Sequence, residues 1–195
     1  AEKPLLNPMC GSGTIALEAA MIASNIFPGI TGRNYAFQHW PDFDQSLFER
    51  VLEAMPEPHP LNHQVIATDI DSQAVRIAKS NARSLGMEKQ IRIEKADFLG
   101  SQEMVESVMI IMNPPYGERL EVENIEKLYQ QIGTTLKHKY PGSSAWLFTA
   151  NMKAAKHIGL KPKLKHSLFN AGLECKYFNY SLFQGERKQH IYGSI

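Results

Sequence analysis

Apolar positions follow two spacings along this chain, and the two spacings alternate. Short runs rich in β-branched residues are typical of buried strands, and apolar residues three or four positions apart are typical of amphipathic helices. The runs predict strands near residues 5–6, 64–71, 91–95, 108–112 and 145–150. The helical spacing predicts helices at residues 15–23, 72–85, 122–138 and 151–158.

The order of these segments predicts the fold class. Strands that alternate with helices form a mostly parallel sheet covered by helices on both faces. Two further strands are expected at residues 173–183 and 189–195, joined as a hairpin by the loop 184–188. We therefore expect an α/β, doubly wound sheet of seven strands that ends in a C-terminal antiparallel hairpin.

The composition narrows the class of protein. With 195 residues, of which 43% are hydrophobic and 21% charged, the chain is expected to form a single globular domain over residues 1–195. No membrane span and no secretory signal are expected, because no apolar run reaches about 18 residues and the start lacks a signal pattern. Cys10 and Cys175 fit neither a disulfide framework nor metal-ligand spacing, which predicts a cytoplasmic protein without a metal. Because the chain enters a strand almost at once, we expect it to be a piece of a longer polypeptide.

Residues 24–63 interrupt the alternation with prolines and six aromatic residues. Helical spacing holds only over residues 44–55. Since a long loop in a compact domain is usually functional, this segment is expected to flank a ligand site, with a satellite core as the alternative.

A glycine loop follows the first strand. Gly11 and Gly13 allow positive φ and let a ligand approach the backbone closely. Free N–H groups at the start of the next helix favour an anionic group. The loop has two glycines and not the three of the dinucleotide fingerprint, so a packing role stays an alternative.

Acidic residues end the second and third strands. In nucleotide-binding doubly wound folds, a carboxylate at the end of the second strand holds a ribose diol, and Asp69 and Asp71 are both candidates. Asp71 is alternatively a cap of the helix that begins near Ser72, and Ser72 is itself a candidate cap. Asp97 is a candidate acceptor for an adenine amino group, with Phe98 beside the ring.

The fourth strand stops at a proline corner, which we define as residues 113–116. Each proline fixes its own φ, and the residue before a proline is held extended, so the corner is stiff. It presents two acceptors, the Asn113 side-chain oxygen and the Pro114 carbonyl, beside the flat ring of Tyr116. This arrangement suits a planar group that carries an NH2, such as a purine, a cytosine or a primary amide. A simple strand-ending turn is the alternative.

Charge is distributed unevenly between the two parts of the chain. Residues 1–136 carry 11 Lys/Arg and 18 Asp/Glu, a net charge of −7, whereas residues 137–195 carry 10 Lys/Arg and 2 acids, a net charge of +8. A basic second part suggests a nucleic-acid footprint, and an ordinary solvated face is the alternative. The candidate nucleic-acid-binding residues are Lys161, Lys163, Lys165, Arg187 and Lys188.

Three stretches together resemble one family. Residues 7–14 are similar to a loop of the form Asp-Pro-x-Cys-Gly-Ser-Gly-Thr, residues 113–119 to Asn-Pro-Pro-Tyr-Gly-Glu-Arg, and residues 169–175 to a third segment of that family. The chain resembles the Rossmann-like, S-adenosylmethionine-dependent methyltransferases, and among them the THUMP-associated bacterial ribosomal RNA large-subunit guanine-N2 methyltransferases. One position departs from the pattern, because Asn7 stands where the family has Asp.

The resemblance implies an enzyme that transfers a methyl group from S-adenosylmethionine to guanine N2 of ribosomal RNA, in a protein with an RNA-binding domain upstream. Asn113, Pro114 and Tyr116 would act on the target amine, and no metal is required. The residues implied to bind the cofactor are Asn7, Pro8, Cys10, Gly11, Ser12, Gly13, Thr14, Asp69, Asp71, Asp97, Phe98 and Asn113.

Other functions use the same corner or the same fold. DNA adenine-N6 methylation and protein glutamine methylation need the same acceptors for a planar NH2. A glutamine methyltransferase would not need the basic second part. A non-catalytic RNA-binding module and an NAD-dependent dehydrogenase are alternatives of other classes; the short glycine loop disfavours the dehydrogenase.

Overall fold

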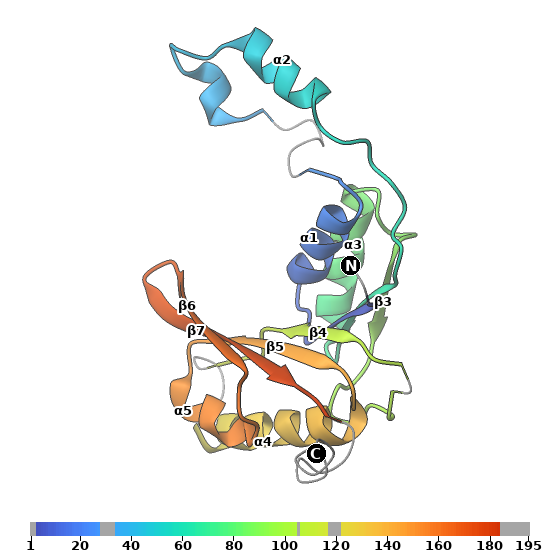
Figure 1. Ribbon diagram of the computed structural model, residues 1–195, viewed down its shortest axis with the longest axis vertical. Helices are drawn as coiled ribbons and strands as arrows, with labels where there is room; N and C mark the ends of the chain where they lie inside the picture. Colours follow the sequence, from blue (N-terminus) through green and yellow to red (C-terminus); the bar gives the residue numbers. More distant parts are fainter. Residues whose placement is uncertain (1–2, 28–33, 105, 117–121, 184–195) are drawn as a thin grey trace, which may run out of the picture.

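The computed structural model describes residues 3–27, 34–104, 106–116 and 122–183 of the 195-residue chain. Seven strands and seven helical segments make up this part of the molecule (Figure 1). In chain order they are β1 Leu5–Pro8, α1 Thr14–Ala23, η1 Ala36–His39, α2 Gln45–Glu53, β2 Val65–Asp69, α3 Ser72–Ser84, β3 Ile91–Lys95, β4 Met109–Met112, α4 Val122–Lys139, β5 Ser144–Thr149, α5 Met152–Ala155, η2 Lys156–Ile158, β6 Leu164–Asn170 and β7 Leu173–Ser181.

The strands form a single sheet in the order β3-β2-β1-β4-β5-β7-β6. Neighbours from β3 to β5 are parallel, and β7 is antiparallel to both β5 and β6. The strand order reverses between β1 and β4, and ligands of open α/β sheets lie beyond the carboxyl ends of the strands at such a point. The prediction of a mostly parallel, doubly wound sheet with an antiparallel end is confirmed.

Helices cover the two faces of the sheet, α1 and α3 on one and α4 and α5 on the other (Figure 1). In the first layer, α1 and α3 pack on β1, β2 and β3 through small residues such as Ala16, Ala20 and Ala78. The second layer packs β4, β5 and β7 against α4, where Tyr129, Ile132 and Leu136 are fully buried. Within the described residues, no helix is long and apolar enough to cross a membrane.

The C-terminal hairpin differs from its predicted position. It consists of β6 and β7, and its turn lies at Ala171 and Gly172, where Ala171 has a φ of 52°. The hairpin partner of β7 is β6, which precedes it in the chain. The prediction that the loop 184–188 joins β7 to the other strand of the hairpin is therefore wrong. Every residue of β6 is exposed, so the strand has no buried face whose apolar alternation would mark it in the sequence. The strand expected at residues 189–195 lies outside the described residues.

Residues 34–60 form an arm that projects away from the sheet (Figure 1). Its aromatic rings pack on one another, with centroids 5.2 Å apart for Tyr35 and Phe37 and 5.7 Å for Phe37 and Phe48. The arm leaves the end of α1 and returns to the start of β2, with His59 N donating to Ser24 O. It therefore lies at the amino ends of the strands, which contradicts the expectation that it flanks the ligand site. Its aromatic rings pack on one another, but no residue of the arm is buried as a satellite core would require.

Candidate methyl-transfer site

Four predicted segments meet at one edge of the sheet. The glycine loop, which we define as residues 9–13, follows β1, Asp69 ends β2, Asp97 follows β3 and the proline corner follows β4. These strands are neighbours in the order β3-β2-β1-β4 and run in parallel, so their carboxyl ends lie side by side. The fold thus brings together residues that are up to about 100 positions apart in the sequence.

The glycine loop has a fixed backbone path. Met9, Gly11 and Gly13 have φ of 53°, 55° and 82°. Cys10 N donates to Thr68 O at 2.9 Å, which ties the loop to β2, and Gly13 N donates to Cys10 O. A Cβ on Gly11 would meet no atom within 4 Å, so the backbone there faces open space. The helix α1 that follows has no side-chain cap, and its first N–H groups remain available to a ligand.

Asp69 holds the glycine loop in place. Its Oδ2 accepts from Gly11 N and its Oδ1 from Asp71 N, both at 2.9 Å. Because both oxygens take part in these contacts, the carboxylate acts first as a brace for the backbone. The bond to Gly11 joins residues 58 positions apart.

Asp71 caps α3. Its Oδ1 accepts from Gln73 N at 2.8 Å, and Asp71 is the N-cap residue, so the alternative of Ser72 as the cap is wrong. The side chain is exposed, and its Oδ2 has no hydrogen-bond partner among the described residues. Capping through Oδ1 and ribose binding through Oδ2 are therefore compatible.

Asp97 and Phe98 lie at the end of β3 but point to different surroundings. Asp97 is exposed, and its Oδ1 accepts from Leu99 N at 2.9 Å. The ring of Phe98 is only 5% exposed and stacks on Tyr140 at 5.5 Å, within the core between the sheet and α4. This placement corrects the expectation that Phe98 offers an open face beside an adenine ring.

Asn7 links the two strands on which the site depends. It is fully buried in β1, and its Nδ2 donates to Ile111 O of β4 at 2.7 Å, two residues before the proline corner. Its Oδ1 is buried without a partner among the described residues. Pro8 beside it is also buried, so its side chain packs in the sheet.

The side chains of Cys10 and Ser12 in the loop, and of Thr14 at the start of α1, make few hydrogen bonds. Ser12 and Thr14 are exposed, and their hydroxyl oxygens lie 3.0 Å apart. Burial, with the nearby Asp69 charge as a smaller cause, raises the pKa of the Cys10 thiol from its ordinary value to about 11. Asn81 of α3 donates to Ser12 O at 3.0 Å, a contact that no local pattern indicates because 69 positions separate the two residues.

The proline corner is open to solvent at its first residue. Asn113 and Pro115 are exposed, Pro114 is buried and Tyr116 is half-buried. The corner is therefore open to solvent, and a substrate contact at Asn113 requires this openness.

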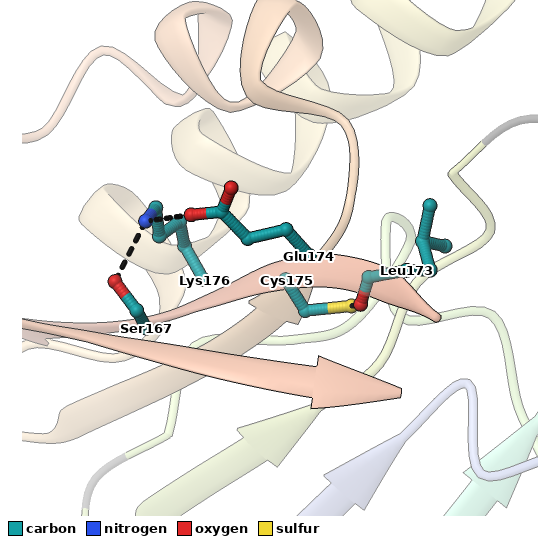
Figure 2. Close-up of polar contacts among 5 residues, drawn as sticks. All are labelled: Ser167, Leu173, Glu174, Cys175 and Lys176. Atoms are coloured by element: carbon teal, nitrogen blue, oxygen red, sulfur yellow. Dashed lines mark hydrogen bonds and ion pairs between the residues drawn. The ribbon is translucent and has the colours of Figure 1, made fainter. Parts of the chain in front are cut away.

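Basic side chains cover the hairpin that ends beside the corner. Lys161, Lys163 and Lys165 are exposed, and Lys165 Nζ lies 5.6 Å from the centroid of the Phe178 ring. Figure 2 shows that Lys176 bridges Ser167 and Glu174, so this lysine is already paired, and it lowers the pKa of Glu174. The predicted RNA contacts of Arg187 and Lys188 lie outside the described residues.

Two further observations concern possible metal ligands and cavities. No group of three or more His, Cys, Asp or Glu side chains that would hold a metal occurs in the described ranges. A small apolar cavity between α1, β1 and β4 is lined by Leu5, Val65 and Met109, which begin their strands. It thus lies at the edge opposite the glycine loop.

The strand order and the antiparallel β7 define a doubly wound, Rossmann-like domain, with the glycine loop beside the proline corner at the carboxyl ends of the strands. The chain belongs to the RMKL-like methyltransferase domain family, whose profile matches residues 1–179.

Comparison with known proteins agrees with this assignment. The chain is 37% identical over 180 residues to the ribosomal RNA large subunit methyltransferase K/L of Legionella pneumophila (strain Lens), covering 91% of this chain and 26% of that protein. It is 35% identical over 193 residues to the protein of that name from Shewanella amazonensis, covering 96% and 27%. The chain thus spans about a quarter of the length of these two relatives, and 48% of another relative that it matches.

Solved structures share the fold over nearly the whole chain. SMU.472 complexed with SAH is 30% identical with a TM-score of 0.81, covering 95% of this chain and 49% of that one. A Listeria monocytogenes protein predicted to be an N6-adenine-specific DNA methylase is 31% identical with a TM-score of 0.76, covering 93% and 47%. The predicted resemblance to this enzyme class is confirmed.

Proposed function

We propose that this domain transfers a methyl group from S-adenosylmethionine to an exocyclic amino group of an RNA base, guanine N2 of large-subunit ribosomal RNA. One observation carries the proposal. The glycine loop and the exposed proline corner end neighbouring strands, β1 and β4, and Asn7 joins these strands through Ile111 O. A group held at the loop therefore lies next to a group held at the corner.

The residues around the glycine loop fit the cofactor. Its carboxylate suits the uncapped start of α1, and its amino group suits the unpaired Asn7 Oδ1. The ribose diol suits the free oxygen of exposed Asp71, and the adenine amino group suits exposed Asp97. When bound, S-adenosylmethionine supplies a methyl group on a positively charged sulfur, which is already a good leaving group.

The corner acts on the nitrogen that accepts the methyl group. An exocyclic amine is a poor nucleophile because its lone pair is delocalised into the ring. Asn113 Oδ1 and the Pro114 carbonyl accept the two N–H groups, which favours a pyramidal nitrogen and aims its lone pair. Positioning of this kind supplies about 7–11 kcal/mol of a barrier. The same oxygens stabilise positive charge that develops on the nitrogen, and its surplus proton leaves to water.

Tyr116 and the basic hairpin bind the rest of the substrate. A paired target base has to be extruded, at a cost of a few kcal/mol. Stacking on an aromatic ring recovers about 1–3 kcal/mol per base, and the half-buried Tyr116 ring lies in the corner for this purpose. Lys161, Lys163 and Lys165, together with Arg187 and Lys188, contact phosphates, so their replacement weakens the salt dependence of RNA binding.

Substrate identity is tested with labelled donor. Full-length protein is incubated with tritiated S-adenosylmethionine and unmodified ribosomal RNA, DNA or a release factor, and the methylated nucleotide is mapped by mass spectrometry. We expect label on a guanine 2-amino group of the large-subunit RNA. Label on DNA adenine or on protein glutamine would replace this substrate with the alternative that uses the same acceptors.

A further inference from the structure

Tyr116 is held at both ends by asparagine side chains from distant parts of the chain. Asn151 Nδ2 donates to the Tyr116 carbonyl oxygen at 3.2 Å, and Asn170 Nδ2 donates to the Tyr116 hydroxyl at 3.4 Å. The first contact comes from the end of β5 and the second from the end of β6. The proposed transfer chemistry assigns neither asparagine a role.

Asn151 is itself fixed by the core. Its Oδ1 caps α5 by accepting from Ala154 N at 2.9 Å, and its backbone N donates to Thr149 Oγ1 at 3.0 Å. Thr149 lies 2.6 Å from the Tyr129 hydroxyl, and both residues are fully buried. Burial raises the pKa of Tyr129 to about 12. The Asn151 amide therefore has a defined orientation towards the corner.

Asn170 belongs to the hairpin that carries the exposed lysines. It is the last residue of β6, next to the turn at Ala171. Seven paired positions join β6 to β7, and the Lys176 bridge drawn in Figure 2 adds a side-chain link between them. A hairpin fixed in this way transmits a contact made along β6 to the residue at its end.

We infer that Asn151 and Asn170 are positioning residues that orient the Tyr116 ring for the target base, and that Asn170 couples this ring to the basic hairpin. The inference rests on the proposed function, because it concerns the same corner. Asn151 fixes the backbone end of Tyr116 from the core. Asn170 fixes the hydroxyl end from β6, the strand that carries Lys165, so RNA held by the hairpin meets a ring already set in place.

Asn151→Asp separates positioning from helix capping. The aspartate keeps an oxygen for Ala154 N and so keeps the cap, but it loses the N–H group that binds the Tyr116 carbonyl. We expect wild-type thermal stability and wild-type cofactor affinity, with kcat/KM for RNA lowered about tenfold, the loss of roughly one hydrogen bond. Asn151→Ala loses both contacts and serves as the comparison for the cap.

Asn170→Ala and Tyr116→Phe each remove one partner of the hydrogen bond between Asn170 Nδ2 and the Tyr116 hydroxyl. We expect each to lower kcat/KM for RNA by a few fold, as loss of an exposed hydrogen bond does, and the double variant to be no worse than either alone. Asn62→Ala is the matched control, because Asn62 is an exposed asparagine at the opposite edge of the sheet. Additive effects of the two changes would overturn the coupling.

A second readout does not depend on transfer. With labelled tyrosine, NMR signals of the Tyr116 ring are expected to shift or broaden in Asn151→Asp and Asn170→Ala but not in Asn62→Ala. Unchanged ring signals in the first two variants overturn the inference, whether or not the enzyme methylates RNA. If wild-type protein transfers no methyl group to any RNA, the proposed function fails separately.

Discussion

The glycine loop and the proline corner end neighbouring strands of one sheet, yet different kinds of contact hold them in place. Backbone groups and carboxylates of adjacent strands fix the loop, through Thr68 O and Asp69. Amide side chains hold the corner and the strand before it. Asn7 of β1 binds Ile111 of β4, and Asn151, the N-cap of α5, and Asn170 of β6 bind Tyr116.

This difference predicts which property each change affects. A loop held through its backbone N–H groups cannot be altered without loss of stability or of cofactor affinity. A corner held by side chains can be altered one contact at a time, and its variants are expected to change transfer while the fold and cofactor binding remain.

The largest effect is expected at Asn113. Asn113→Ala removes one of the two acceptors for the target amine, and removal of one such group typically costs about 10²–10³ in kcat. Since Asn113 is exposed, thermal stability should stay at the wild-type value, and cofactor affinity is measured by calorimetry alongside because the resemblance also assigns Asn113 to the cofactor. Asn62→Ala, another exposed asparagine at the opposite edge of the sheet, should leave transfer unchanged. Full transfer by Asn113→Ala would refute the proposed mechanism of the corner.

Substitutions at Gly11 and Gly13 test the glycine loop, the other side of the comparison. A Cβ on Gly13 would lie 3.0 Å from Ala78 Cβ at a φ of 82°, whereas Gly11 has open space at a φ of 55°. We expect Gly13→Ala to lose about 2 kcal/mol or more of unfolding free energy, from strain and overpacking together. Gly11→Ala should lose about 1 kcal/mol, from strain alone.

The effect on the cofactor should follow the reverse order. The methyl group added at Gly11 enters the space next to the loop, so Gly11→Ala should weaken cofactor binding more than its effect on stability suggests. Denaturant midpoints and calorimetric titration of both variants measure the two quantities. Equal loss of affinity in the two variants would place the cofactor away from Gly11.

Asp71 tests whether one carboxylate serves both the fold and the cofactor. Asp71→Asn keeps a capping oxygen for Gln73 N, so stability should stay near wild type, whereas Asp71→Ala should lose about 0.5–2 kcal/mol. If the free oxygen binds the ribose diol, both variants should bind the cofactor about tenfold more weakly or worse, as loss of a charged hydrogen bond does. Wild-type affinity of Asp71→Asn would leave Asp71 as a cap alone.

The same difference explains how much the sequence predicts. The loop depends on local chemistry, so its strand, glycines and helix follow from a few neighbouring residues, and the third strand occupies the predicted residues 91–95. The contacts of the corner, and that of Asn7 with the strand before it, span 35 to 104 positions. Asn151 is predictable as a cap of α5, but its bond to Tyr116 depends on how β4 and β5 pair.

Besides long-range hydrogen bonds, local sequence patterns also do not determine how deeply a side chain is buried. Phe98 follows a strand end like a ligand-binding residue, but α4 places Tyr140 against its ring. The strand β6 escapes a search for apolar alternation because no residue in it is buried. Both differences from expectation concern tertiary neighbours and not the secondary structure of the residues themselves.

The smallest effect is expected at Cys10, where the surroundings of the loop raise the pKa of the thiol. Burial and Asp69 raise the pKa of its thiol to about 11, so the protonated form is favoured in the folded protein. This stabilisation is complete below the ordinary thiol pKa and is lost as the pH rises towards about 11. Alkylation of Cys10 by iodoacetamide, followed in a Cys175→Ser background, should therefore reach its half-maximal rate near pH 11.

Asp69→Asn provides the control for this titration. Removing the Asp69 charge should lower the pH of half-maximal alkylation, but only in part, because burial is the larger cause of the raised pKa. The same variant presents an amide N–H to backbone donors that now pair with a carboxylate, so the loop should also bind the cofactor more weakly. A half-maximal rate near the ordinary thiol pKa in the parent would mean that the loop is open enough to hydrate Cys10. The loop would then not be the more rigid of the two sides of the site.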